Sequence, residues 1–167
     1  CIVSRNGMAG VGEGHCRTVP ETGKEVVGRF VQYRTTNGGL EQQGLPLTHE
    51  FPEVSDLNGQ SYTVQYFDRA VFEKHPENAA PNDVLLSLLG TFLYKQTYRD
   101  GAPNQQASTT NASTFSETGM TVGGTFIESW NTHGGLAETG FPLPNACGAK
   151  SPLAGNPYLG QYFGRAG

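Results

Sequence analysis

The chain has 167 residues, of which 36% are hydrophobic and 16% are charged, and its formal net charge is −4. An acidic balance without a Lys/Arg cluster excludes a nucleic-acid-binding surface. The longest apolar stretch, at 84–89, is far below the roughly 18 residues needed to cross a membrane. The 23 Gly and 10 Pro indicate many turns, whereas 9 Phe and 7 Tyr supply core material.

Residues 1–20 are expected to form an N-terminal extension. The sequence starts at Cys1, which is either a lipid-carrying residue behind a cleaved signal peptide or the product of ordinary cleavage or fragmentation. Cys1, Cys16 and Cys147 form no C-x-x-C pair, so no zinc or thioredoxin-like site is predicted. Low Lys content and Ser/Thr/Asn/Gln-rich loops are typical of the cell exterior, where a disulfide persists. We expect Cys16 to pair with Cys147 and tie the two halves together, although spacing alone does not fix connectivity.

Two stretches of the chain repeat each other without a gap. Residues 21–70 align with 117–166 at a shift of 117 − 21 = 96 residues. The aligned identities include Glu-Thr-Gly (21–23 and 117–119), Gly-Gly-Leu (38–40 and 134–136), Gly-x-Pro-Leu (44–47 and 140–143) and Gln-Tyr-Phe-x-Arg-Ala (65–70 and 161–166). The period predicts two tandem copies of one supersecondary unit.

A short helix opens each copy. Phe30, Val31 and Arg34 stand at helical spacing within 30–36, and Phe126, Ile127 and Trp130 hold the same places in the second copy. The following Gly-Gly pair ends the helix, since glycine adopts the left-handed conformation of a C-terminal cap without steric cost. The next segment, Gly-x-Pro-Leu, is a rigid turn.

A β-hairpin follows the helix in the first copy. Asn58-Gly59 marks a turn, 62–67 alternates as a strand, and 71–73 is the returning strand. Residues 81–83, Pro-Asn-Asp, predict the cap of a helix over 83–89. The expected fold class is α+β and loop-rich, with two tandem copies of a short helix plus β-hairpin repeat packed together. We assign repeat 1 and its C-terminal helix to 21–99, a Ser/Thr/Asn-rich linker to 100–116, and repeat 2, lacking its last strand and helix, to 117–167.

The Gly-Gly-Leu-x-x-x-Gly-x-Pro-Leu motif, at 38–47 and 134–143, resembles the LGFP-type repeats of bacterial cell-surface proteins. The longer pattern, from Glu-Thr-Gly at 21–23 to His-Pro-Glu-Asn at 75–78, is also similar to a repeat of secreted bacterial proteins. This resemblance implies attachment or binding outside the cytoplasm, at the cell surface. It implies no particular ligand.

The residues shared by the two copies argue against an enzyme. They are mainly Gly, Pro, Leu, Phe and Tyr, which serve folding, and the strongly polar shared residues are a Glu (21 and 117), a Gln (65 and 161) and an Arg (69 and 165). We expect the Arg to cap carbonyl groups or to pair with a carboxylate such as the Glu. The four His residues show no convergent acid–base arrangement. No catalytic residue, cofactor or metal is predicted.

Two functions from different classes remain. The first is a structural or adhesive module that assembles with copies of itself. The second copy stops before the counterpart of strand 71–73, so its hairpin edge, with Tyr162 and Phe163, should be open. The segment Cys1-Ile2-Val3 of the same or a neighbouring chain is a candidate donor strand, and donation by a neighbour would generate a filament. Alternatively, the polypeptide was longer, and the missing strand is disordered or was cut away.

The second function is a carbohydrate- or cell-wall-binding module of a larger secreted protein, with a cell-envelope polymer as its partner. Aromatic rings stack on sugar faces, and the candidates are Trp130, Tyr33, Tyr158 and Tyr162. A core role for Trp130 is the competing interpretation, because aromatic residues at helical spacing usually pack inward. Polymerisation would favour the first function, and monomeric behaviour would favour the second.

Overall fold

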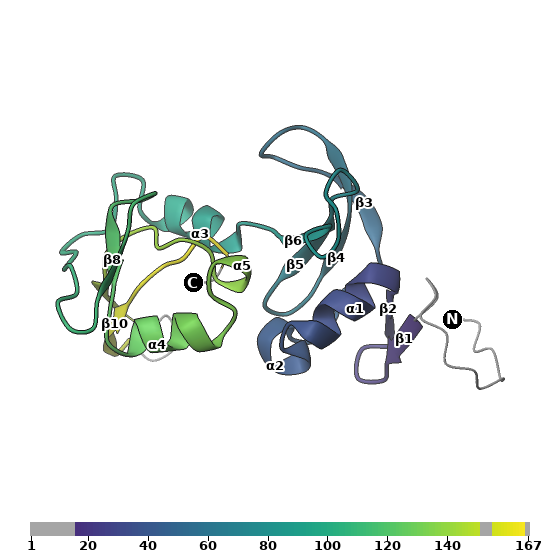
Figure 1. The fold of residues 1–167 in the computed structure, drawn as a ribbon, viewed down its shortest axis with the longest axis horizontal. Helices are drawn as coiled ribbons and strands as arrows, with labels where there is room; N and C mark the ends of the chain where they lie inside the picture. Colours follow the sequence, from purple (N-terminus) through teal and green to yellow (C-terminus); the bar gives the residue numbers. More distant parts are fainter. Residues whose placement is uncertain (1–15, 151–154, 166–167) are drawn as a thin grey trace. The chain divides into compact units, whose positions relative to one another are not determined.

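The computed structural model describes residues 16–150 and 155–165 (Figure 1). The chain is α+β, and its described residues form five helices and several small antiparallel sheets. It divides into two compact units, unit 1 at Cys1–Ser87 and unit 2 at Leu88–Gly167. None of the described helices is long and apolar enough to cross a membrane.

Unit 1 begins with a hairpin and two short helices and ends in a sheet (Figure 1). The hairpin pairs β1 (Cys16–Val19) with β2 (Lys24–Val27), and α1 (Gly28–Thr36) and α2 (Gly39–Gln43) follow. The sheet contains β3 (Phe51–Val54), β4 (Ser61–Tyr66), β5 (Val71–Lys74) and β6 (Val84–Leu86). These four strands are antiparallel and lie in sequence order.

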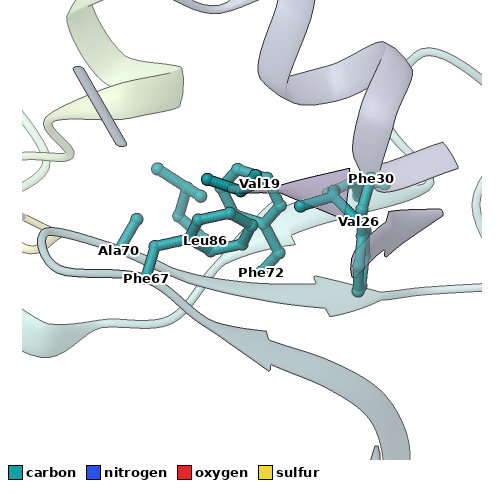
Figure 2. Packing of buried hydrophobic residues seen from close by; sticks show 8 residues of the cluster. Val19, Val26, Phe30, Phe67, Ala70, Phe72 and Leu86 are labelled. Atoms are coloured by element: carbon teal, nitrogen blue, oxygen red, sulfur yellow. The ribbon is translucent and has the colours of Figure 1, made fainter. Parts of the chain in front are cut away.

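The core of unit 1 is centred on Phe72 of β5, which is 0% exposed (Figure 2). Its ring lies edge-on to Phe30 of α1, with centroids 5.6 Å apart, and contacts Phe67 at 4.3 Å. Phe67, the residue after β4, belongs to this core, whereas Tyr62 and Val64 of β4 form a second cluster with Val71. Strand β5 therefore supplies core residues to both faces of the sheet.

Unit 2 begins with helix α3 (Leu89–Thr97) and contains two further hairpins (Figure 1). The first pairs β7 (Ser113–Phe115) with β8 (Met120–Val122), and α4 (Thr125–Thr132) and α5 (Gly135–Glu138) follow. The second pairs β9 (Cys147–Lys150) with β10 (Pro157–Gly160). Val122, Ile127 and Phe163 form the core, against which Phe115, Phe126 and Trp130 pack.

The helix predicted over 83–89 is wrong, because its first half is strand β6. The amide of His75 donates to the carbonyl of Asp83 at 2.8 Å, and the amide of Ser87 donates to that of Val71 at 3.0 Å. These bonds extend the β5–β6 ladder at both ends. A short apolar run fits a buried strand as well as a helical turn, and pairing with β5 decides between them. The helix begins only at Leu89.

The stretch predicted as a linker, 100–116, is folded into unit 2. The amide of Gln106 donates to the carbonyl of Ala146 at 2.8 Å, and the amide of Gly124 donates to that of Thr110 at 2.9 Å. Helix α3, which the sequence assigned to repeat 1 within 21–99, also belongs to unit 2, since the amide of Thr91 donates to the carbonyl of Gly164 at 3.0 Å. The polar composition of 100–116 is typical of a linker, yet its backbone groups form hydrogen bonds within unit 2.

The predicted disulfide between Cys16 and Cys147 does not form. Cys16 is disulfide-bonded, whereas Cys147 carries a free thiol and is 0% exposed. Cys147 lies in β9, where it is paired with Gly160. Burial raises the pKa of this thiol, which disfavours the reactive thiolate.

Candidate functional site

The strongest candidate site is the outer edge of strand β10. Its inner edge pairs with β9, in a register that places Tyr158 opposite Ala149. Beyond β10 the pairing continues in a register shifted by two residues, where Pro142 forms a bridge with Phe163 and the amide of Leu143 donates to the carbonyl of Tyr162 at 3.0 Å. Within 16–150 and 155–165, no strand pairs with the other edge. An unpaired edge presents backbone donors and acceptors that a further strand can bind.

Side chains along this edge are exposed, in contrast to those of β4 in unit 1. Tyr158 is 47% exposed and Leu159 is 59% exposed. At 158 − 96 = 62, Tyr62 is only 6% exposed. Strand β5 accounts for the difference, because it pairs with β4 and contributes Val71 to the cluster around Tyr62. Among the described residues of unit 2, no strand takes the place of β5, so the side chains of β10 stay exposed.

Two of the predicted assembly residues are occupied inside unit 2. The ring of Tyr162 lies 5.5 Å from that of Tyr94 on α3 and 5.8 Å from that of Tyr98, the residue that follows α3. Burial raises the pKa of Tyr162, and the neighbouring Tyr98 and Tyr158 add to the shift. Phe163 is 8% exposed and belongs to the core. The other predicted assembly residues, Cys1, Ile2 and Val3, lie outside the described residues.

The predicted ligand-binding aromatics do not form one exposed surface. Trp130 is half-buried, donates from Nε1 to the carbonyl of Gly140 at 3.0 Å, and packs edge-on against Phe115 at 5.2 Å. Tyr33 is half-buried in unit 1. Tyr158 is the candidate with an exposed ring, and strand alternation places it on the same face as Tyr162.

One polar cluster in unit 1 was not predicted from the sequence. The His75 ring lies between two carboxylates, with Nδ1 2.8 Å from Glu77 and Nε2 3.2 Å from Glu73. The ring also contacts that of Tyr62, with centroids 4.1 Å apart and the two planes tilted by 36°. The hydroxyl of Ser87 donates to Glu73 and not to the imidazole, so this is not a nucleophile–base pair. The spacing Glu-x-His-x-Glu at the end of a strand was the signal that could have revealed it.

A second polar pair fixes α1 to the start of β6. The Nε of Arg29 donates to Asp83 at 2.6 Å, and a second guanidinium nitrogen bonds the other carboxylate oxygen. This hydrogen-bonded guanidinium holds the pKa of Asp83 below its ordinary value. The described residues contain no group of three or more His, Cys, Asp or Glu that could hold a metal ion.

Comparison of the chain with family models, with curated proteins and with solved structures gave no match.

Proposed function

We propose that this chain is a non-catalytic structural or adhesive protein of the cell exterior, built from two copies of one helix-plus-hairpin repeat. Its second copy is completed by a strand from another chain, so that the protein assembles with copies of itself. The observation that carries the proposal is the exposed outer edge of β10, together with the covered edge of β4.

The repeat is supported by the buried glutamine of each hairpin. Gln65 donates from Nε2 to the carbonyls of Glu25 at 2.8 Å and Thr48 at 2.9 Å. Gln161 donates to the carbonyls of Thr121 at 2.8 Å and Pro144 at 3.0 Å. The acceptors are separated by 121 − 25 = 96 and 144 − 48 = 96 residues, the same shift that aligns the sequences.

A second recurring bond is made by different side chains. Arg34 of α1 donates from Nη2 to the carbonyl of Gly44 at 2.8 Å, and Trp130 of α4 donates from Nε1 to that of Gly140 at 3.0 Å. Both the donor positions and the acceptors are 96 residues apart. Arg and Trp share only an N–H at the end of a long side chain. Both copies therefore place an N–H donor at this helix position, and it bonds the carbonyl of the glycine in the following Gly-x-Pro-Leu turn.

The third shared polar residue also serves the fold. Arg69 donates to the carbonyl of Glu41 at 2.6 Å, and Arg165 donates to that of Leu136 at 2.7 Å. The expectation that these arginines cap carbonyl groups is thus met. A side chain committed to a backbone carbonyl holds the hairpin against the second helix. This use of the shared polar residues favours a structural role over catalysis.

An extracellular location is supported by the state of Cys16. This residue is disulfide-bonded, and such bonds persist in oxidising compartments such as the cell exterior. The likeness of the Gly-Gly-Leu-x-x-x-Gly-x-Pro-Leu motif to bacterial surface repeats leads to the same location.

Light scattering and electron microscopy of the purified 167-residue chain test the assembly. We expect closed oligomers or ordered fibres, with fibres indicating head-to-tail strand addition. A monomer of 17.9 kDa at every concentration would reject self-assembly.

The alternative, a carbohydrate- or cell-wall-binding module, is favoured by one observation, the exposed Tyr158 near Tyr162. Sedimentation with purified cell-wall polymer tests it. Binding that is lost in Tyr158→Ala and kept in Tyr33→Ala would support this function, whereas equal binding by both variants would reject Tyr158 as the contact.

A further inference from the structure

We propose that the outer edge of β10 pairs antiparallel with the same edge of a second copy. The two chains would then share one sheet of order β9-β10-β10-β9 around a two-fold axis. This inference rests on the proposed self-assembly and names its contact.

Among the described residues, Leu159 of β10 directs its backbone N–H and C=O groups to this edge. Successive residues of an antiparallel strand direct their N–H and C=O groups to opposite sides. The carbonyl of Tyr162 accepts a bond from Leu143, on the β9 side. Tyr158 and Gly160 therefore also face β9, and Leu159 faces outward. Two Leu159 residues related by a two-fold axis can exchange both N–H···O=C bonds.

The exposed edge of β3 in unit 1 is a poorer contact because it carries a charged residue, Glu53, as well as an outward-facing proline. Tyr66 of β4 bonds Leu47, on the β3 side, so Thr63 directs its backbone toward β5. Pro52 is opposite Thr63, and its nitrogen accordingly points away from β4. Proline has no N–H to donate, and natural sheets use it to block edges. In β10 the outward-facing proline is Pro157, the first residue, and the amide of Leu159 points outward two residues later, as that of Val54 does in β3. The two edges differ in charge, because β3 contains Glu53 and β10 contains no charged residue.

The edge of β10 is complementary to itself. Residues 157–163 carry no charged side chain, so two-fold pairing places no like charges opposite each other. Leu159, 59% exposed, would face Leu159 of the second copy on one side of the sheet. Tyr158, 47% exposed, would be covered on the other side.

The sheet of unit 1 supports the choice of a second β9–β10 hairpin as the partner of the β10 edge. Its hairpin β3–β4 is not left as a pair but is extended to four antiparallel strands by β5 and β6. A two-stranded sheet alone is marginally stable in water, and added strands stabilise it. Pairing of two β9–β10 hairpins would reach the same four strands, with uncharged, apolar side chains at the junction.

The test is the mass of the 167-residue chain in solution, measured by sedimentation velocity over a range of concentrations. We expect a dimer of the 17.9 kDa chain. Leu159→Lys puts like charges opposite each other and should weaken the dimer about ten-fold or more. The matched control is Val54→Lys, at a 63% exposed position on the β3 edge, which the proposed dimer does not use, and it should leave the dimer unchanged.

A second variant gives a positive signal that loss of folding cannot mimic. Opposite residues of a hydrogen-bonded pair have Cβ atoms about 5.5 Å apart, farther than the roughly 4 Å of a disulfide, so Leu159→Cys should form a covalent dimer with a short bifunctional thiol reagent, whereas Val54→Cys should not. A dimer unaffected by Leu159→Lys, without this cross-link, would overturn the inference. Fibres would also overturn it while leaving the proposed assembly intact. A monomer at all concentrations would overturn both.

Discussion

Replacing the buried glutamine of the first hairpin tests whether its two carbonyl contacts stabilise unit 1. Gln65 is 0% exposed, and Gln65→Leu keeps the approximate shape while removing both bonds, to Glu25 at 2.8 Å and Thr48 at 2.9 Å. A buried acceptor that loses its donor costs about 1–3 kcal/mol, so two acceptors cost about 2–6 kcal/mol. The Oε1 of Gln65 is itself buried without a hydrogen-bond partner, and removing it offsets part of this cost. We expect a net loss of about 2–3 kcal/mol.

Urea denaturation followed by circular dichroism measures this loss. With an m-value of about 1 kcal/mol/M, the midpoint of unit 1 should fall by about 2 M. Gln161→Leu is the equivalent change in unit 2, which contains the only tryptophan, and fluorescence of Trp130 should report a fall of similar size. Gln96→Leu, at an exposed position of α3, is the control and should change little. Unchanged midpoints for Gln65→Leu and Gln161→Leu would refute the assigned role of the glutamines.

Three further predictions concern acid stability, core packing and the free thiol. Because Arg29 holds the pKa of Asp83 below its ordinary value, the ionised Asp83 stabilises the fold at pH values above the ordinary carboxyl pKa, and this stabilisation is lost as the pH falls through the folded value. Urea midpoints measured across acid pH should therefore decline less in Asp83→Asn, by about 1 kcal/mol or less. Phe72→Ala should cost about 3–5 kcal/mol and lower the thermal midpoint of unit 1, and a cost under about 1 kcal/mol would contradict its central place in the core. Cys147 should react with a thiol reagent only as fast as unit 2 opens, so labelling at the rate of an exposed cysteine in native buffer would contradict its burial.

The elements that the sequence predicted well depend on local signals. The spacing of Phe30 and Arg34 predicted a helix, and α1 buries both side chains. Alternation over 62–67 and a return over 71–73 predicted the β4–β5 hairpin. Both elements are built from residues close in the sequence, whose periodicity carries the information.

The elements that were missed depend on distant partners. Residues 84–86 have no periodicity of their own and become a strand because β5 lies beside them. The stretch 100–116 looks like a linker by composition, yet Gln106 bonds Ala146, forty positions away. For the candidate site, the sequence indicated an open hairpin edge but named Tyr162 and Phe163, which the fold covers. The sequence did not identify Leu159, because only the hydrogen bonds of the structure show which residues of β10 direct their backbone groups to the outer edge.

The boundary after Ser87 has a consequence for cutting the chain into fragments. The repeating sequence starts again at residue 117, but the folded body that contains it starts at Leu88. A fragment designed from the sequence period would lose Thr91, which holds the carbonyl of Gly164, and the tyrosines that cover Tyr162. A recombination event that transfers unit 2 intact has to include α3, which precedes the repeated sequence. The second compact unit therefore starts 117 − 88 = 29 residues before the second copy of the repeated sequence, and it includes α3 and the stretch that follows it.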